Sequence, residues 1–251
     1  GIGMKGSHGA GHIGMPHCGA GEIRHTCREN LKKGADLLKL FITPGVPDPA
    51  STFVPSFLSL EEISAAVSEG ARLGIPTAAH CIGGQGLKDC IDGGVDVIEH
   101  MYMASEQDVE RLAASRCVVD LTSGIFLDPS REEFLSPANA LKVRLNRSRV
   151  RENVARIIKA RLPFVLGTDA YHGFLYREVG YAVELGTDPV TAIQGVTSRA
   201  ARVCRLEDRI GKLENGMEAD IIAVEGNPLE DVSRLSQVGL VMKGGVVYRQ
   251  P

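Results

Sequence analysis

Helical and strand-like patterns of apolar residues alternate along the chain from residue 22 onward, and glycines mark most of the changes. The clearest unit begins at Ser59, which forms a capping-box pattern with Glu62 at the start of an amphipathic helix. Gly74 ends that helix, and the short apolar run 75–79 that follows leads directly to His80. A short apolar run without alternation is typical of a strand that is buried on both faces of a parallel sheet.

The same succession of helix and short apolar strand recurs four more times. The further pairs are 22–33 with 35–41, 85–92 with 95–100, 106–116 with 117–122, and 149–161 with 163–169. Strands that alternate with helices predict an α/β fold with parallel strands and right-handed crossovers. These units supply five strands, whereas a closed (β/α) barrel has eight. Either three units precede Gly1 in a longer protein or the sheet is open, and the Gly-rich opening 1–9, which resembles a strand end and its loop, favours the first alternative.

The C-terminal part of the chain has a different pattern. A helix is expected from about Asp188 to Cys204, with Pro189 in its first turn. Short apolar strands then follow, of which the last two flank a Lys-Gly-Gly turn and predict a hairpin. The expected strands are 219–224, 238–242 and 246–249. We therefore divide the chain into a partial barrel, 1–206, and a small β unit, 207–251.

Composition narrows the classes of function. The chain is 43% hydrophobic and 24% charged, with a formal net charge of -3, so no net positive field would attract nucleic acid or an anionic membrane. No apolar run approaches the roughly 20 residues of a membrane helix, and no secretory leader pattern opens the sequence. The six cysteines form no Cys-x-x-Cys pair and are expected to be reduced thiols. We expect a cytoplasmic protein that acts on a small molecule.

Four chemically active side chains fall at or near the C-terminal ends of predicted strands: Lys39, His80, His100 and Asp169. Each alone has an ordinary structural interpretation, but the C-terminal strand ends are where a barrel of this class gathers its catalytic groups. Two imidazoles and a carboxylate suit a divalent metal such as zinc, manganese or iron. Glu99, one residue before His100, is expected to point to the opposite side of its strand.

These motifs resemble the amidohydrolase superfamily, most closely its imidazolonepropionase-like and metal-dependent Xaa-Pro dipeptidase branch. The similar segments are GADLLKL at 34–40, AAH at 78–80, GGVDVIEH at 93–100 and GTD at 167–169, which match barrel strands four, five, six and eight. The stretch 209–220 and the GNPL sequence at 226–229 are similar to a tail that completes a β-sandwich in these proteins. The resemblance implies a (β/α)8 TIM-type barrel, of which this chain holds the C-terminal five or so units.

The resemblance also implies the roles of the four residues. Lys39 would be carboxylated by CO2 and bridge two metals, and His80 and His100 would bind one of these ions. Asp169 would bind the other ion and move the proton during catalysis. The implied activity is hydrolysis of an amide-type C–N bond by metal-bound hydroxide, in a dipeptide, an N-acyl amino acid or a cyclic amide. Zinc is the default expectation, as one or two ions.

Three further residues are expected to contact the substrate. By the resemblance, His8 corresponds to a histidine of a Gly-rich loop that lines the substrate pocket. Tyr171 and His172 come directly after Asp169, at the end of a predicted strand, where loop residues can reach a bound molecule.

One part of the family pattern is missing, because the sequence contains no His-x-His pair, which the family carries on strand one. The resemblance therefore implies that strands one to three and half of the β-sandwich lie outside this chain, which alone would be weakly active or inactive. Open sheet edges predict a homo-oligomer or an N-terminal half as partner. Two alternatives remain: a lyase that uses Lys39 as a Schiff base, and a non-catalytic fragment or binding module.

Overall fold

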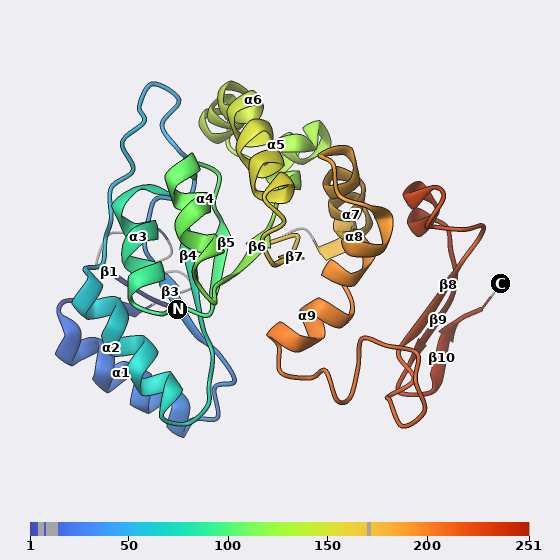
Figure 1. Ribbon diagram of the computed structural model, residues 1–251, viewed down its shortest axis with the longest axis horizontal. Helices are drawn as coiled ribbons and strands as arrows, with labels where there is room; N and C mark the ends of the chain where they lie inside the picture. Colours follow the sequence, from blue (N-terminus) through green and yellow to red (C-terminus); the bar gives the residue numbers. More distant parts are fainter. Residues whose placement is uncertain (5–7, 9–14, 170–171, 251) are drawn as a thin grey trace.

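A computed structural model of the chain describes residues 1–4, 8, 15–169 and 172–250, and its main element is a parallel sheet of seven strands (Figure 1). The strands occur in the order β2-β1-β3-β4-β5-β6-β7, so that β2 and β7 are the two edges within the described residues. Their bounds are β1 Ile2–Met4, β2 Met15–His17, β3 Leu38–Phe41, β4 Thr77–Cys81, β5 Val97–His100, β6 Val118–Leu121 and β7 Phe164–Leu166. The predicted α/β class with parallel strands is confirmed.

Helices connect these strands, and α1 and α2 pack side by side at one end of the molecule (Figure 1). The helices of the first part are α1 Ala20–Lys32, α2 Leu60–Ala71, α3 Gly84–Asp92, α4 Glu106–Ala113, α5 Gly124–Leu127, η1 Pro129–Phe134 and α6 Pro137–Lys159. After β7 come η2 His172–Phe174, α7 Leu175–Glu184, α8 Pro189–Gly195 and α9 Ser198–Val203. The predicted capping box starts α2, since the Glu62 amide donates to Ser59 Oγ at 3.3 Å and the Ser59 amide donates to Glu62 Oε2 at 2.8 Å.

The register gives the central strands two different faces. Leu40 pairs with Ala79 and Ala79 with Ile98, and all three side chains are buried in the hydrophobic core. The opposite face carries polar residues, because Phe41 is aligned with His80, His80 with Glu99, and Glu99 with Asp120. Side chains alternate along a strand, so Lys39 shares the face of Phe41. The sheet therefore separates an apolar core from a face with ionisable groups.

Three elements differ from the predictions. Strand β2 was not predicted. It contains Pro16, which is tolerated because β2 is an edge strand among the described residues and needs fewer backbone donors. Helix α7 was not predicted, and its sequence has Gly180 in its interior and no side-chain hydrogen bond at its N-cap. The expected helix 188–204 is two helices, because Thr197 has non-helical φ and ψ of -129° and -102° and its hydroxyl donates to the Ile193 carbonyl at 2.8 Å.

A separate antiparallel sheet forms the C-terminal end, at the far side of the molecule from α1 and α2 (Figure 1). Its strands are β8 Ile221–Val224, β9 Val238–Lys243 and β10 Val246–Arg249, in the order β10-β9-β8, with η3 Val232–Ser236 between β8 and β9. The predicted hairpin is confirmed as β9 and β10. The domain division at residue 206 stays a prediction. Among the described residues, every helix is too short or too polar to span a bilayer.

Candidate active site

Strands β3, β4 and β5 bring three of the predicted residues together on one side of the sheet. Lys39 lies on β3, His80 lies near the C-terminal end of β4, and His100 ends β5. The imidazole centroids of His80 and His100 are 4.5 Å apart, and both residues are about 95% buried. The ring of His8 lies 4.5 Å from that of His80 on its other side. The structure thus forms a row of three imidazoles over the polar face of the sheet.

Hydrogen bonds fix the orientation of the two buried histidines. His100 Nδ1 lies 2.7 Å from the Thr122 hydroxyl, which also lies 2.6 Å from the hydroxyl of the buried Tyr102. His80 Nε2 lies 3.0 Å from the Pro44 carbonyl oxygen, an acceptor, so this nitrogen carries the proton. One nitrogen of each ring therefore remains available as a ligand: Nδ1 of His80 and Nε2 of His100.

Burial keeps both histidines neutral. It lowers the pKa of His80 to about 3, against the opposing effect of the Pro44 hydrogen bond, and nearby His8 and Lys39 lower it further. Burial also lowers the pKa of His100 well below its usual value, again with help from the positive charge of Lys39. A neutral imidazole has the lone pair that metal coordination requires.

The prediction for Glu99 is wrong. Its carboxylate contacts Lys39 Nζ directly and lies on the same face as His80, not on the opposite face. The reason is the backbone of His100, whose φ is +79°, followed by Met101 with φ +54°. This left-handed turn breaks the alternation of the strand, so that both Glu99 and the His100 ring reach the site. His100 Nε2 is 3.9 Å from Glu99 Oε2.

Asp120 on β6 is a site residue that the sequence reasoning missed. Burial raises its pKa to about 7, while Lys39 opposes the effect and Asp169 adds to it. Its Oδ1 atom is buried and has no hydrogen-bond partner among the described residues. The end of β7 passes close by, since a Cβ on Gly167 would lie 2.9 Å from Asp120 Oδ1. An acidic residue inside the apolar run 117–122 was the signal that could have identified it.

Burial also changes Lys39, lowering its pKa to about 8, while the nearby carboxylates of Asp169 and Asp120 work in the other direction. Asp169 follows β7 and has a φ of +56°. Its charge acts on His8, Lys39 and Asp120, so the structure brings the fourth predicted residue into the same region.

Of the three predicted substrate contacts, the structure describes His8 and the backbone of His172. His8 is exposed, and one side of its ring packs against the site, with the ring centroid 5.7 Å from that of Phe41 in an edge-on arrangement. Burial and Lys39 lower its pKa, whereas Asp169 raises it. His172 begins η2, six residues after the end of β7 in the sequence. Tyr171 lies outside the described residues.

The donor set can be tested for its fit to a metal. In the part of the chain that the structure describes, no three His, Cys, Asp or Glu side chains come together to hold an ion. Two neutral imidazoles are suitable ligands for a zinc-like cation, but such sites use at least three protein ligands. A carboxylated Lys39 would add an oxygen ligand beside His80 and His100. The residues thus fit one divalent cation, provided that Lys39 is modified.

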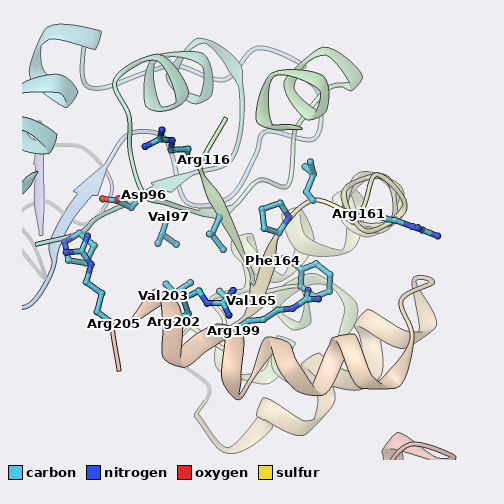
Figure 2. Close-up of a pocket in the computed structure, with 14 residues that line it drawn as sticks. Asp96, Val97, Arg116, Arg161, Phe164, Val165, Arg199, Arg202, Val203 and Arg205 are labelled. Atoms are coloured by element: carbon cyan, nitrogen blue, oxygen red, sulfur yellow. The ribbon is translucent and has the colours of Figure 1, made fainter. Parts of the chain in front are cut away.

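A cavity of about 540 Å³ lies elsewhere, at the N-terminal ends of the strands (Figure 2). Pro76, Asp96 and Pro163, which precede β4, β5 and β7, line it together with Arg199 and Arg202 of α9. It includes none of the predicted site residues. In barrels the N-terminal strand ends serve stability and the C-terminal ends carry the chemistry, so we place the candidate active site at the histidines.

Comparison with known proteins identifies the family. The model of the amidohydrolase family matches residues 6–247, almost the whole chain. The chain belongs to the amidohydrolase family. Members of this family generally bind divalent metals. The resemblance noted in the sequence is thereby confirmed.

Individual relatives agree with this assignment. The ochratoxinase of Aspergillus niger is 32% identical over 248 residues, which cover 93% of this amidohydrolase and 50% of the relative. The crystal structure of a Xaa-Pro dipeptidase with methionine bound in its active site superposes with a TM-score of 0.85 at 29% identity, covering 99% of this chain and 66% of the dipeptidase. An imidazolonepropionase of Desulfotalea psychrophila is 24% identical over 179 residues, 67% of this chain and 38% of that enzyme. The chain spans half or less of the length of these curated relatives.

Proposed function

We propose that this amidohydrolase hydrolyses an amide-type C–N bond in a small molecule, at the site formed by Lys39, His80, His100 and Asp169. The observation that carries the proposal is the pair of buried, neutral imidazoles, each oriented by a hydrogen bond, beside a partly buried lysine on the same face of a parallel sheet. Such a constellation is unusual in a core that needs only packing, and orienting contacts of this kind are typical of metal ligands.

His80 and His100 would hold a divalent cation, of which zinc is our first choice, and Lys39 would complete the site as a carbamate formed with CO2. When bound, such a cation polarises a carbonyl group and lowers the pKa of a coordinated water. Asp169 follows β7 beside Lys39 and Asp120, and we assign it the transfer of a proton to the leaving nitrogen. His8 and His172 would contact the substrate, and Tyr171 is proposed for the same role from its position in the sequence.

The class of substrate is a proposal that is based on the relatives. The relatives include an ochratoxinase and a Xaa-Pro dipeptidase. Dipeptides, N-acyl amino acids and cyclic amides all present a carbonyl with a nitrogen leaving group. We propose that the substrate belongs to this set. Because the sequence contains no His-x-His pair, we expect the chain on its own to bind one cation and to hydrolyse weakly.

The test is metal content per chain after expression in medium with zinc and bicarbonate, for the wild type and Lys39→Ala. Lys159→Ala at the exposed end of α6 is the matched control. We expect about one equivalent of zinc in the wild type and the control, and loss of metal in Lys39→Ala. Growth on ¹³C-bicarbonate should add a carbamate signal to the carbon NMR spectrum of the wild type, and this signal should be absent from Lys39→Ala. A wild type that retains no metal would refute the proposed site.

A second candidate is favoured by the contact of Lys39 Nζ with Glu99. A partly buried amine beside a carboxylate also suits Schiff-base chemistry, in which Glu99 would exchange protons with the carbinolamine. Borohydride reduction in the presence of a carbonyl compound distinguishes the two functions. A covalent adduct on Lys39 would support the lyase and exclude the carbamate, since one nitrogen cannot serve both.

The oligomeric state is proposed separately. We propose that the chain associates with itself or with another segment that covers the free edge of β7, because unpaired strand edges pair readily. Size-exclusion chromatography with light scattering tests this, and a monomer at all concentrations with a sharp melting transition would refute it.

A further inference from the structure

A fully buried ion pair lies beside the candidate active site and is not explained by the proposed ligands. Arg131 of η1 donates from Nη2 to Glu178 Oε1 of α7 at 2.9 Å, and neither side chain has any exposed surface. Burying two charges requires a large desolvation energy, so such a pair is weak evidence for stability.

The pair connects three segments at the C-terminal ends of the strands. Arg131 also donates from Nη1 to the Thr168 carbonyl oxygen at 3.3 Å, in the segment that follows β7. Both carboxylate oxygens of Glu178 accept from the Gly124 amide, at 3.1 and 3.0 Å, in the segment that follows β6. The guanidinium and carboxylate thus act as a bridge between these two loops and α7.

The contact with Thr168 determines the conformation of its neighbour. The Thr168 carbonyl belongs to the peptide unit that joins Thr168 to Asp169, and the orientation of this unit defines the φ of Asp169. That φ is +56°, in the left-handed region, which costs a non-glycine residue energy unless its surroundings hold it there. Arg131 supplies a hydrogen bond to this peptide unit and so restrains the backbone that leads into Asp169.

The space around the pair is fitted to it. A Cβ on Gly124 would lie 2.5 Å from both Arg131 Nη2 and Glu178 Oε1, so this position must be glycine for the pair to form. On the other side the Phe174 ring lies 5.4 Å from the guanidinium carbon of Arg131 and 4.6 Å from that of Arg177. The guanidinium is enclosed, and Asp128 Oδ2 lies 3.7 Å from Arg131 Nε as a second acidic neighbour.

We propose that Arg131 and Glu178 are positioning residues, which hold the Thr168–Asp169 peptide so that the Asp169 carboxylate can transfer a proton at the reacting bond. Neither residue touches the substrate in this proposal. The inference rests on the proposed function of Asp169 and adds the two residues on which the placement of Asp169 depends. Small displacements of a proton-transfer group reduce kcat much more than substrate binding.

The principal test replaces both charges at once, with the double variant Arg131→Met, Glu178→Leu. An apolar pair of similar volume leaves no unpaired buried charge, so the protein is expected to fold. It lacks the donor to Thr168, so we expect kcat of the metal-loaded protein to fall by about tenfold to a hundredfold, while KM stays within about twofold and zinc content is unchanged. Wild-type kcat in a folded double variant would overturn the proposal.

A matched control uses an exposed ion pair whose acidic partner also lies on α7. Arg151 of α6 donates to Glu184 of α7 at 2.6 Å, with side chains 45% and 52% exposed. The double variant Arg151→Gln, Glu184→Gln removes the same types of charge and is expected to keep wild-type kcat and KM. If both double variants lose kcat equally, Arg131 and Glu178 have no special role.

A second readout does not depend on activity. The Gly167 amide donates to the Leu121 carbonyl at 2.9 Å and reports on the segment that contains Thr168. In Arg131→Met, Glu178→Leu, hydrogen exchange at Gly167 should accelerate by about tenfold or more, whereas amides of α2 should be unaffected. Unchanged exchange at Gly167 would refute the positioning role, whether or not the wild type is active. A wild type that neither binds metal nor hydrolyses a substrate would instead refute the proposed function.

A conservative variant covers the case in which the double variant does not fold. Arg131→Lys keeps the charge but has one nitrogen, which cannot reach both Glu178 and the Thr168 carbonyl. We expect intermediate loss of kcat and intermediate acceleration of exchange at Gly167. Wild-type values for both in Arg131→Lys would overturn the proposal.

Discussion

Asp120 provides a direct test of the electrostatics of this site. It lies on β6 between β5 and β7, and its buried Oδ1 has no hydrogen-bond partner among the described residues. Burial raises its pKa from 3.8 to about 7. We predict that Asp120→Asn stabilises the metal-free protein above pH 7 and has little effect at pH 4. The amide keeps the size of the side chain and removes the charge.

The sign and size follow from proton linkage. A carboxyl whose pKa is raised on folding binds its proton more tightly in the folded state, so its contribution to stability is complete below the unfolded pKa and is lost as the pH rises through the folded value. Raising the pKa from 3.8 to about 7 corresponds to at most about 4 kcal/mol, at about 1.4 kcal/mol for each pH unit. Incomplete pairing of the new amide reduces the gain, so we expect about 1–3 kcal/mol at pH 8.

The assay is urea unfolding of EDTA-treated protein between pH 4 and pH 8, for the wild type, Asp120→Asn and the exposed control Asp208→Asn. Other groups titrate in the same range, and the difference between two proteins cancels most of their effect. The stability difference for Asp120→Asn should grow with pH and level off near pH 8, while the control difference stays near zero. A difference that is constant with pH, or a less stable variant at pH 8, would show that Asp120 is not held in a desolvated site.

Two further predictions concern contacts around the histidines and the buried ion pair. Thr122→Val removes the hydroxyl that contacts His100 and Tyr102. We expect the free energy of unfolding in urea to fall by about 1–3 kcal/mol, and zinc binding measured by calorimetry to weaken by about 10- to 100-fold. Unchanged zinc affinity would contradict the orienting role of Thr122. Gly124→Ala should destabilise the protein by about 1–3 kcal/mol in thermal unfolding, because its Cβ has no space. In Gly180→Ala of α7 the Cβ would meet no atom within 4 Å, so this substitution should stabilise the protein by about 0.5–1 kcal/mol in the same assay. Equal effects of the two substitutions would refute the steric argument.

Much of the fold could be predicted because its signals are local. The capping box at Ser59 and the glycine stops are read from a few neighbouring residues, and they placed α2 and the strands around it. The interrupted helix near Thr197 was not predicted, because a side-chain hydrogen bond to the Ile193 carbonyl competes with the helical pattern there. Strand β2 was missed because Pro16 argues against a strand unless the strand is known to be an edge.

The candidate site was predicted only in part. His80 and His100 meet because the C-terminal ends of parallel strands lie together, and this follows from the alternation of helices and strands. Lys39 is the second residue of β3 and lies on the same face of the sheet. Glu99 was assigned to the wrong face, because the alternation rule assumes a regular strand and the backbone of His100 is left-handed. Asp120 received no role, since its importance depends on which strands flank β6.

The sequence by itself determined the class of the fold, the family and the residue types available for chemistry, because periodicity, caps and motifs are properties of short segments. Only the tertiary structure decided which of these side chains face one another. The register of three neighbouring strands aligned His80, Glu99 and Asp120, and a pair of residues 47 positions apart, Arg131 and Glu178, became a buried bridge to Thr168. Pairing over such distances depends on how the whole chain packs, and the burial that changes each pKa exists only in the folded state.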